Sequence, residues 1–417
     1  MLIKIVNCNM NFKAKRNLIN YLFYLFLYGG ILVDNIVGYY MRTTLQENNI
    51  GKVYRIFHMI FLLYILIIYN TLETRFVLCS FSLSLILPFF YYFLYGNKEV
   101  FITDYIYIVK LYFPICLCLA GKILCTRNYI TKAGVENYIF NVSWIYPLTI
   151  IVPYCFNLGF KAYHTSGYSG FYSSGNELSI VLCVCFTIAF KQFCEKKMFK
   201  YVIHLALTGI CVILTGAKTG ILIILMTVLW YAFKEGKKNI KFYISVMFIL
   251  GVLSIFIIFL FSDEILMNIS RLQYKYKLLN NNLINFLFSN RNQKILPNLK
   301  KTIYDFPKGM LNIFIGKGYY NQVIMQKVSK NIASFGLIEM DFFDVFFEYG
   351  IFETIFVCTF YIKVLLTKIR KQKEIYKFIY IYILMFSAFA GHTLFQSQSG
   401  MILGIIACIN LIYKKGK

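Results

Sequence analysis

Charged side chains gather at a few points of a chain that is otherwise apolar. Lys218 lies in the turn Leu-Thr-Gly-Ala-Lys-Thr-Gly at 214–220, between two apolar stretches that almost no loop separates. A charge in such surroundings is costly unless it has a partner, and an anionic phosphate is a suitable partner. The alternative is a lysine at a helix end whose ammonium group snorkels toward water.

A long polar segment follows at 262–341. Its residues 262–338 include eleven basic and three acidic residues, a net charge of +8, and Arg291 lies near the middle. A field of this sign attracts anionic lipids or an anionic substrate. A solvated basic surface without a ligand is the alternative interpretation.

Acidic residues follow at the end of this segment, at Glu339, Asp341, Asp344 and Glu348. The last three are spaced i, i+3 and i+7, so they line one face of a helix. Several acids that enter an apolar helix together need cations or water nearby, and Lys218 and Arg291 are the candidate cations. Enrichment of acids at a helix N-terminus explains the first two acids but explains Glu348 poorly.

Two further polar groups interrupt the apolar stretches. The loop 159–177 is rich in Gly, Ser and Tyr and ends at Asn176 and Glu177, so its hydroxyl and amide groups suit a weak sugar site. The alternative is an ordinary loop that caps the next helix. The second group, 391–400, contains His392, whose imidazole could carry a proton near neutral pH or could be structural.

The composition of the chain indicates which class of structure positions these side chains. The chain has 417 residues, of which 59% are hydrophobic and 15% charged, yet its net charge is +25. Soluble globular chains have about 25% charged residues, so a water-soluble enzyme is excluded, and so is a disordered chain. A nucleic-acid-binding domain needs a polar basic surface that this chain does not offer. We therefore predict an all-α polytopic integral membrane protein.

Apolar stretches long enough for membrane helices recur along the chain. We expect about twelve spans, with residues 1–261 holding nine of them, 262–341 forming a large external loop, and 342–417 holding the last three. The expected spans are 18–40, 54–70, 76–95, 101–121, 138–158, 177–193, 201–217, 219–233, 242–261, 342–362, 376–390 and 398–413.

The basic residues predict the orientation. With the N-terminus in the cytoplasm, the cytoplasmic segments hold 25 Lys and Arg residues, whereas the short external loops hold 6. Because basic residues concentrate in cytoplasmic loops, both termini are predicted to be cytoplasmic and the polar clusters external. The twelve cysteines lie in spans or on the cytoplasmic side, which predicts neither an external disulfide framework nor a thiolate metal site.

Motifs for nucleotide binding, zinc hydrolysis and serine hydrolysis are absent from the sequence. A reaction on the external face would therefore need a donor that is already activated. We expect no metal and no cofactor.

In this order, the polar clusters resemble motifs of the O-antigen and capsular polysaccharide polymerase and ligase superfamily, which includes the Wzy-type polymerases. The resemblance is spread over residues 159–400, and each motif alone is weak. The matching positions are 170–177, 214–220, Asn290-Arg291, 316–318, Glu339 with Asp341, and 348–352. Two departures stand out: Lys218 replaces the usual arginine of the turn, and acids stand where the ligases have histidine, which favours a polymerase.

The resemblance implies a glycosyltransferase that moves a glycan from a polyprenyl-pyrophosphate donor to a lipid-linked acceptor sugar, on the outer face of a bacterial cytoplasmic membrane. It implies that Lys218 and Arg291 bind pyrophosphate, and that Glu339 or Asp341 orients or activates the acceptor. We add His392 as a further catalytic candidate, and Asn176, Glu177 and Asp344 as weak glycan-binding candidates.

Two alternatives remain open at this point, a ligase of the same superfamily and a flippase for a lipid-linked oligosaccharide. The expected partners are the lipid-linked oligosaccharide and the lipid bilayer, with a chain-length regulator as a further candidate and no nucleic acid.

Overall fold

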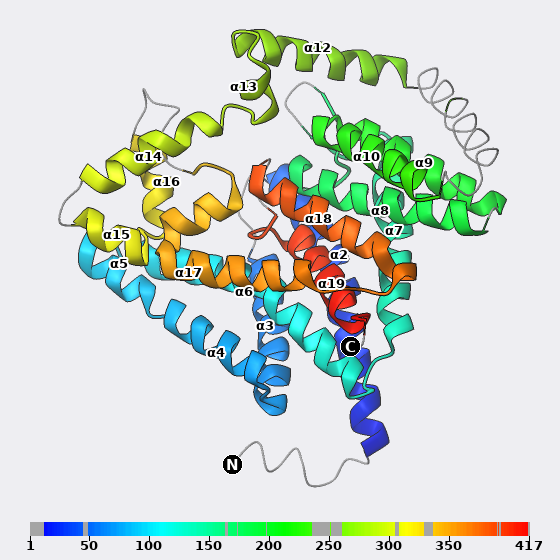
Figure 1. Ribbon diagram of the computed structural model, residues 1–417. Helices are drawn as coiled ribbons and strands as arrows, with labels where there is room; N and C mark the ends of the chain where they lie inside the picture. Colours follow the sequence, from blue (N-terminus) through cyan, green and yellow to red (C-terminus); the bar gives the residue numbers. More distant parts are fainter. Residues whose placement is uncertain are drawn as a thin grey trace.

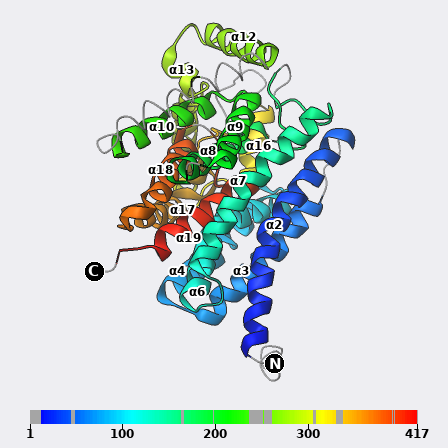
Figure 2. The same cartoon turned by 90° about the vertical axis from the view of Figure 1, so that its right-hand side faces the viewer.

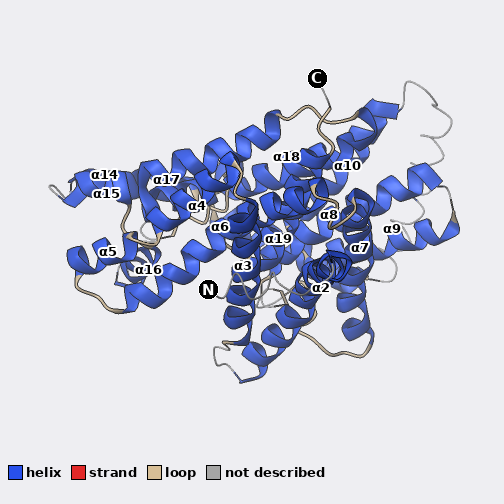
Figure 3. Cartoon of the chain, turned by 90° about the horizontal axis from the view of Figure 1, so that it is seen from below, coloured by secondary structure: helices blue, strands red, loops and turns tan. Residues whose placement is uncertain are grey.

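The protein is an all-α structure in the part of the chain that the computed structural model describes, and Figure 3 shows helices throughout. Among these residues there is no strand, only isolated backbone bridges at Lys161 with Tyr168 and at Ile369 with Lys414. The described residues are 12–44, 49–162, 166–172, 174–196, 198–235, 251, 261–304, 308–328, 337–389, 391 and 393–415.

Figure 1 shows the described helices in their order along the chain. Their bounds are α2 Phe12–Thr44, α3 Ile50–Tyr69, α4 Leu72–Ser84, α5 Leu87–Tyr95, α6 Glu99–Thr126, α7 Lys132–Cys155, α8 Gly175–Lys196, α9 Phe199–Thr215, α10 Lys218–Glu235, α12 Ser262–Leu278, α13 Leu283–Leu287, α14 Asn292–Tyr304, α15 Lys308–Ile315, α16 Tyr319–Val328, α17 Asp341–Leu366, α18 Glu374–Phe389 and α19 Ser397–Ile412, with a 3₁₀ turn at Lys371–Lys373.

Seven helical segments among the described residues are long and apolar enough to cross a membrane: α2, α3, the consecutive α4 and α5 taken together, α6, α7, α8 and α17. This confirms the prediction of a helical membrane protein, but not the number of twelve spans. Two expected spans, 201–217 and 398–413, are the shorter apolar helices α9 and α19. The expected span 242–261 lies outside the described residues except at 251 and 261.

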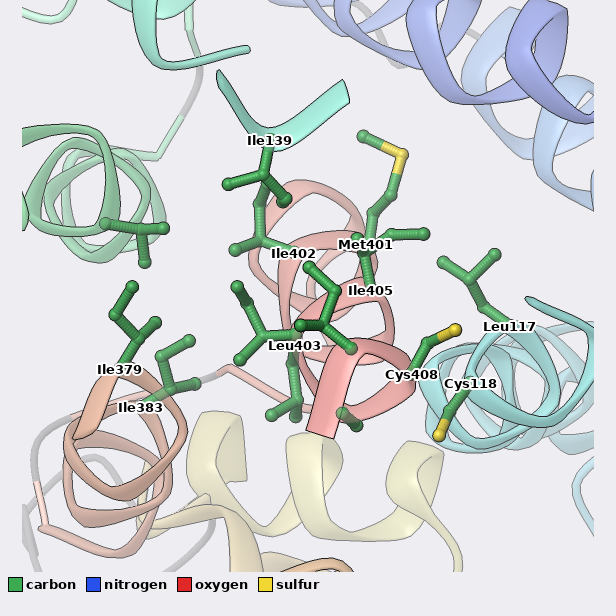
Figure 4. Packing of buried hydrophobic residues seen from close by; sticks show 14 of the residues in the cluster. Leu117, Cys118, Ile139, Ile379, Ile383, Met401, Ile402, Leu403, Ile405 and Cys408 are labelled. Atoms are coloured by element: carbon green, nitrogen blue, oxygen red, sulfur yellow. The ribbon is translucent and has the colours of Figure 1, made fainter. Parts of the chain in front are cut away.

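Helix α19 forms the centre of the core, and Figure 4 shows its side chains among those of α6, α7 and α18. Residues 398–410 of this helix are all buried, because neighbouring helices pack on every side of it. The approach to α6 is so close that a Cβ at Gly404 would lie 2.8 Å from the carbonyl oxygen of Pro114. Helix α19 therefore fixes the positions of its neighbours, including the helices that carry the polar clusters.

Contacts between connecting segments group the polar clusters at one end of the bundle. The amide of Tyr168 donates to the carbonyl of Leu214 at 2.7 Å, so the loop after α7 lies against the turn between α9 and α10. At the other end of the same helices, Lys373 pairs with Glu136 at 2.5 Å and Lys234 pairs with Glu374 at 3.1 Å. The segments predicted to be cytoplasmic thus lie together, while their orientation in the membrane stays a prediction.

The expected external loop 262–341 is mostly helical where it is described. Helix α12 crosses above α9 and α10, at the end opposite the start of α2 (Figure 2). Helix α15 packs against α17, and α16 packs against α6. The segment is therefore built into the fold instead of forming a separate loop.

Helix α17 breaks at Gly350, where φ is +81°. The Gly316-Lys317-Gly318 motif lies against this break, because Lys317 N donates to Phe347 O at 3.0 Å and Gly318 N donates to Glu348 O at 2.9 Å. A Cβ at Gly350 would lie 2.1 Å from Phe314 O, so only glycine fits. Two sequence motifs that lie far apart thus dock on each other through their backbones.

Candidate anion-binding site

The turn between α9 and α10 brings Lys218 to the long helical segment. Gly216 ends α9 in the left-handed region at φ +66°, and its carbonyl accepts a hydrogen bond from Arg271 of α12. A Cβ at Gly216 would lie 2.2 Å from Asn268 Oδ1, so glycine allows α12 to approach. The turn is therefore held against α12, and Lys218 begins α10 directly beside it.

Lys218 is half-buried and its ammonium group binds neutral acceptors. It donates to the carbonyl of Phe286 and to Ser289 Oγ, the latter at 3.0 Å, and it lies 4.6 Å from the centroid of the Phe286 ring. Lys275 Nζ lies 3.4 Å from the same Ser289 Oγ. Ser289 has φ +53°, a left-handed conformation that turns its side chain out of the segment after α13. A single hydroxyl thus lies between two lysines.

Arg291 follows two residues later and is 8% exposed. Its Nε and Nη2 donate to Glu339 Oε2, at 3.1 and 2.7 Å. The side chain of Glu339 is 40% exposed, and its backbone is left-handed at φ +64°. The ion pair therefore reaches from the interior to the surface, and its carboxylate side faces water.

Lys218, Arg271, Lys275 and Arg291 influence one another electrostatically, and we call these four residues the basic cluster. Burial and the charges of the other three lower the pKa of Lys218 to about 8. Burial, Arg291 and Arg271 lower the pKa of Lys275, while Glu339 opposes this. Like charges disfavour each other's charged form, so a bound anion would relieve the cluster. Four cations beside one carboxylate suit a phosphate or a pyrophosphate.

The sequence drew attention to Lys218, Arg291 and Glu339, and the structure brings these three to one place. It did not single out Arg271, Lys275 or Ser289. Arg271 and Lys275 are four residues apart on α12, so their helical spacing could have predicted that they lie on the same face of this helix. No signal in the sequence pointed to Ser289, because its role depends on the left-handed turn after α13.

Asp341 lies beside the site but is fully buried. Its Oδ2 accepts hydrogen bonds from Ser387 Oγ at 2.6 Å, Thr393 N at 2.6 Å and Leu394 N at 2.9 Å. The carboxylate thus holds the turn before α19 in place, and Gly391 of that turn lies near the guanidinium of Arg291. These contacts suit a positioning role for Asp341, while its expected contact with an acceptor sugar stays a prediction. The third catalytic candidate, His392, lies outside the described residues.

The three weak glycan-binding candidates lie apart from the basic cluster or inside the fold. Glu177 is buried, and its Oε1 accepts from Gln398 N at 2.5 Å, so it caps the N-terminus of α19. Asp344 is buried, and its Oδ1 accepts from Ile338 N at 2.8 Å. Both acids therefore serve the backbone and present no surface to a sugar. Asn176 is exposed at the start of α8.

Other buried acids also accept hydrogen bonds that hold helices in place. Asp104 of α6 accepts from the amides of Tyr319 and Tyr320 and so caps α16. Glu353 Oε2 accepts from Ser84 Oγ at 2.8 Å and ties α17 to α4. We infer that most acids near the spans organise the packing of the helices.

Within the described residues, no group of three or more His, Cys, Asp or Glu side chains is arranged to hold a metal ion. Comparison with known proteins found no matching family model, no similar curated protein and no similar solved structure. The class that the fold defines is a helical membrane protein, and its function has to be argued from the basic cluster.

Proposed function

We propose that the protein is a polysaccharide repeat-unit polymerase of the Wzy type. It transfers a glycan from a polyprenyl-pyrophosphate donor to a lipid-linked acceptor sugar, at the outer face of a bacterial cytoplasmic membrane. The observation that carries the proposal is the basic cluster: four cations from α10, α12 and the start of α14 converge beside one surface carboxylate.

In this proposal the basic cluster binds the pyrophosphate of the donor. The acceptor hydroxyl oxygen bonds to the anomeric carbon, the bond from that carbon to the phosphate oxygen breaks, and the pyrophosphate leaves with the electron pair. Lys218 and Arg291 stabilise the charge that develops on the leaving group. Because the cations are already held together in the fold, little reorganisation is needed when the charge appears.

Glu339 takes the proton of the acceptor hydroxyl. Its carboxylate pairs with Arg291 at 2.7 Å. The pyrophosphate competes for that guanidinium, and its binding leaves the carboxylate available as a base. The 40% exposure of the Glu339 side chain is what such a role requires.

An apolar groove beside the cluster suits the lipid part of the donor. It lies between α17 and α18, has a volume of about 320 Å³ and is lined by residues such as Phe342, Leu384 and Phe389. The ring of Phe389 lies 5.7 Å from that of Phe288, the residue before Ser289. A polyprenyl chain in this groove would place its pyrophosphate near the two lysines that share that serine.

The test is polymer synthesis by the purified protein in lipid nanodiscs, supplied with lipid-linked repeat units from its own host. A ladder of products is expected for the wild type, and none for Arg291→Gln. Lys277→Gln is the matched control, since Lys277 is an exposed base in the last turn of α12 and belongs to a different face from Arg271 and Lys275. A ladder from Arg291→Gln equal to that of the wild type would refute the assigned site.

The same assay separates the alternatives. A ligase would attach finished glycan to another acceptor and make no ladder. A flippase would expose lipid-linked units on the second leaflet without joining them, and this is measured in sealed proteoliposomes with a lectin added from outside. A wild type that yields either result and no ladder contradicts the polymerase proposal.

A further inference from the structure

A second hollow lies at the end of the bundle opposite the basic cluster. Its apolar part is a groove of about 530 Å³ between α4, α6, α17 and the end of α19. Phe76, Leu119, Phe356, Phe360 and Leu411 are among its lining residues. The Phe76 side chain is 67% exposed, and its ring lies 5.7 Å from that of Phe356. The groove thus opens on the surface of helices that are apolar enough to cross the membrane.

This groove continues into a larger hollow of about 1000 Å³. The two share Glu73, Thr359, Lys363 and Leu411. The larger hollow is lined by one acid and by five lysines, Lys122, Lys363, Lys368, Lys414 and Lys415. We call these five residues the lysine mouth. An apolar channel therefore ends at a strongly basic opening.

Backbone pairing fixes part of the lysine mouth. Lys415 N donates to Lys368 O at 2.8 Å, and Arg370 N donates to Tyr413 O at 3.2 Å. The end of α19 and the segment after α17 thus run beside each other and hold Lys368, Lys414 and Lys415 together. These contacts are made by main-chain atoms, so the three side chains remain exposed to receive a ligand.

The carboxylate of Glu73 balances only part of the positive charge of the lysine mouth. Glu73 binds Lys122 at 2.5 Å and Lys363 at 3.0 Å. Lys368, Lys414 and Lys415 extend the basic surface beyond that pair, so the hollow has five cations and one anion. Basic pockets between membrane helices attract anionic headgroups.

We propose that this hollow binds one anionic phospholipid of the surrounding bilayer. Its phosphate lies at the lysine mouth, and an acyl chain lies in the groove along Phe76 and Phe360. The match of an apolar groove with a basic end favours a lipid over a free phosphate ion, which would use the basic end alone. In this proposal the headgroups lie level with the ends of α6 and α17, two helices that are long and apolar enough to cross a membrane.

The site is distinct from the proposed polymerase site. Helix α17 runs from Asp341 beside the basic cluster to Lys363 at the lysine mouth, and α19 runs from Ser397 to the residues before Lys414. The two sites therefore lie at opposite ends of the same two helices. An occupant of the groove would pack α4 and α17 together, so we expect it to stabilise the fold.

The test measures lipid binding to the purified full chain by native mass spectrometry, with phosphatidylglycerol and phosphatidylcholine as the probes. We expect the anionic lipid to bind at least tenfold more tightly and to raise the melting temperature. The Lys368→Gln, Lys414→Gln double variant should lose this preference. Lys98→Gln, Lys277→Gln is the control with the same change of charge away from the hollow.

Displacement by phosphate and a variant that fills the groove distinguish a lipid site from a site for a soluble anion. Inorganic phosphate at millimolar concentration should displace little of the lipid, because it lacks the acyl chain. Thr359→Trp should fill the groove and weaken phosphatidylglycerol binding while the lysines remain. Equal binding of the two lipids by the wild type, or an unchanged preference in the lysine double variant, would overturn the proposal. Full displacement by phosphate would show a site for a water-soluble anion instead.

Discussion

Arg291 donates two hydrogen bonds, from Nε at 3.1 Å and from Nη2 at 2.7 Å, to the same oxygen of Glu339, which lies 48 residues later in the chain. The arginine is buried and the glutamate side chain is 40% exposed. The pair thus connects the interior of the bundle with its surface at the basic cluster. It also shows how an anion could enter, since a phosphate would compete with the carboxylate for the guanidinium.

Replacement of this arginine by lysine tests the geometry of the pair. Arg291→Lys keeps the charge but loses the planar fork of donors. A hydrogen bond to a charged group contributes about 1.5–3 kcal/mol, so the loss of one is expected to lower polymer synthesis about tenfold to a hundredfold. The measurement is the initial rate of ladder formation in nanodiscs, with Lys277→Arg as the control. A rate within twofold of the wild type would contradict the role of the fork.

The acid of the pair has a different expected effect. Glu339→Gln preserves the size of the side chain and removes its negative charge, so the basic cluster should bind inorganic pyrophosphate at least as tightly as before. Polymer synthesis should nevertheless fall about a hundredfold or more, because the base is lost. Calorimetry measures the binding and the ladder measures the rate. Parallel loss of both would indicate that Glu339 is needed only for folding.

Lys218 gives the site a pH dependence. Its pKa is lowered to about 8, so the ammonium form is present below this pH and is lost as the pH rises through it. Binding of inorganic pyrophosphate should therefore weaken between about pH 7 and pH 9. Lys218→Arg keeps a positive charge over this range because the pKa of arginine is above about 12. Lys275, whose pKa is also lowered, remains in the variant. The variant should therefore lose less affinity up to pH 9 than the wild type does, and an identical decline in both proteins would exclude Lys218 as the titrating group.

The break in α17 can be tested at its glycine. Gly350→Ala would place a Cβ 2.1 Å from Phe314 O at a φ of +81°. We expect a loss of about 3 kcal/mol or more, because the close backbone contact and the left-handed strain both add to the cost. Gly96→Ala is the matched control: its φ is +71°, but nothing lies within 4 Å of the added Cβ.

The control should lose only the conformational term, about 1–2 kcal/mol. The measurement is thermal unfolding of both variants in the same detergent. If Gly350→Ala were no less stable than Gly96→Ala, the docking of residues 316–318 on the break would not stabilise the fold.

Asp341 separates a positioning role from a catalytic one. Ser387→Ala removes one of its hydrogen bonds and leaves the carboxylate, while Asp341→Asn removes the charge. If Asp341 only holds the turn at 393–394, both variants should lose stability, by about 1–3 kcal/mol, and should lose activity in proportion. A variant Asp341→Asn that keeps its melting temperature but makes no polymer would instead indicate direct contact with substrate.

Composition and residue spacing predicted part of this structure. The excess of apolar residues predicted a helical membrane protein, since only such residues can face lipid. The sequence also drew attention to the charged residues Lys218, Arg291 and Glu339, which the fold brings together. A charge beside apolar segments is costly without a partner, so these positions called for one. The number of spans was harder to predict, because helices such as α9 and α19 are apolar but shorter than the seven helical segments that are long enough to cross a membrane.

The roles of the individual acids depended on contacts that no spacing reveals. Glu177 and Asp104 each cap a helix that lies more than 200 residues later in the chain. In the sequence they are indistinguishable from Glu339, which reaches the surface. Helical periodicity places Asp341, Asp344 and Glu348 on one face but does not say which backbone amides meet that face.

The sequence by itself determined the class of the protein and the places where its charge required explanation, because both follow from the cost of placing polar groups in an apolar environment. The tertiary structure decided which charges face one another. It joined Lys218 to Lys275 through Ser289, paired Arg291 with Glu339, and directed most of the remaining acids to the backbone. These outcomes depend on helix packing around α19 and on left-handed turns, which are properties of the folded chain.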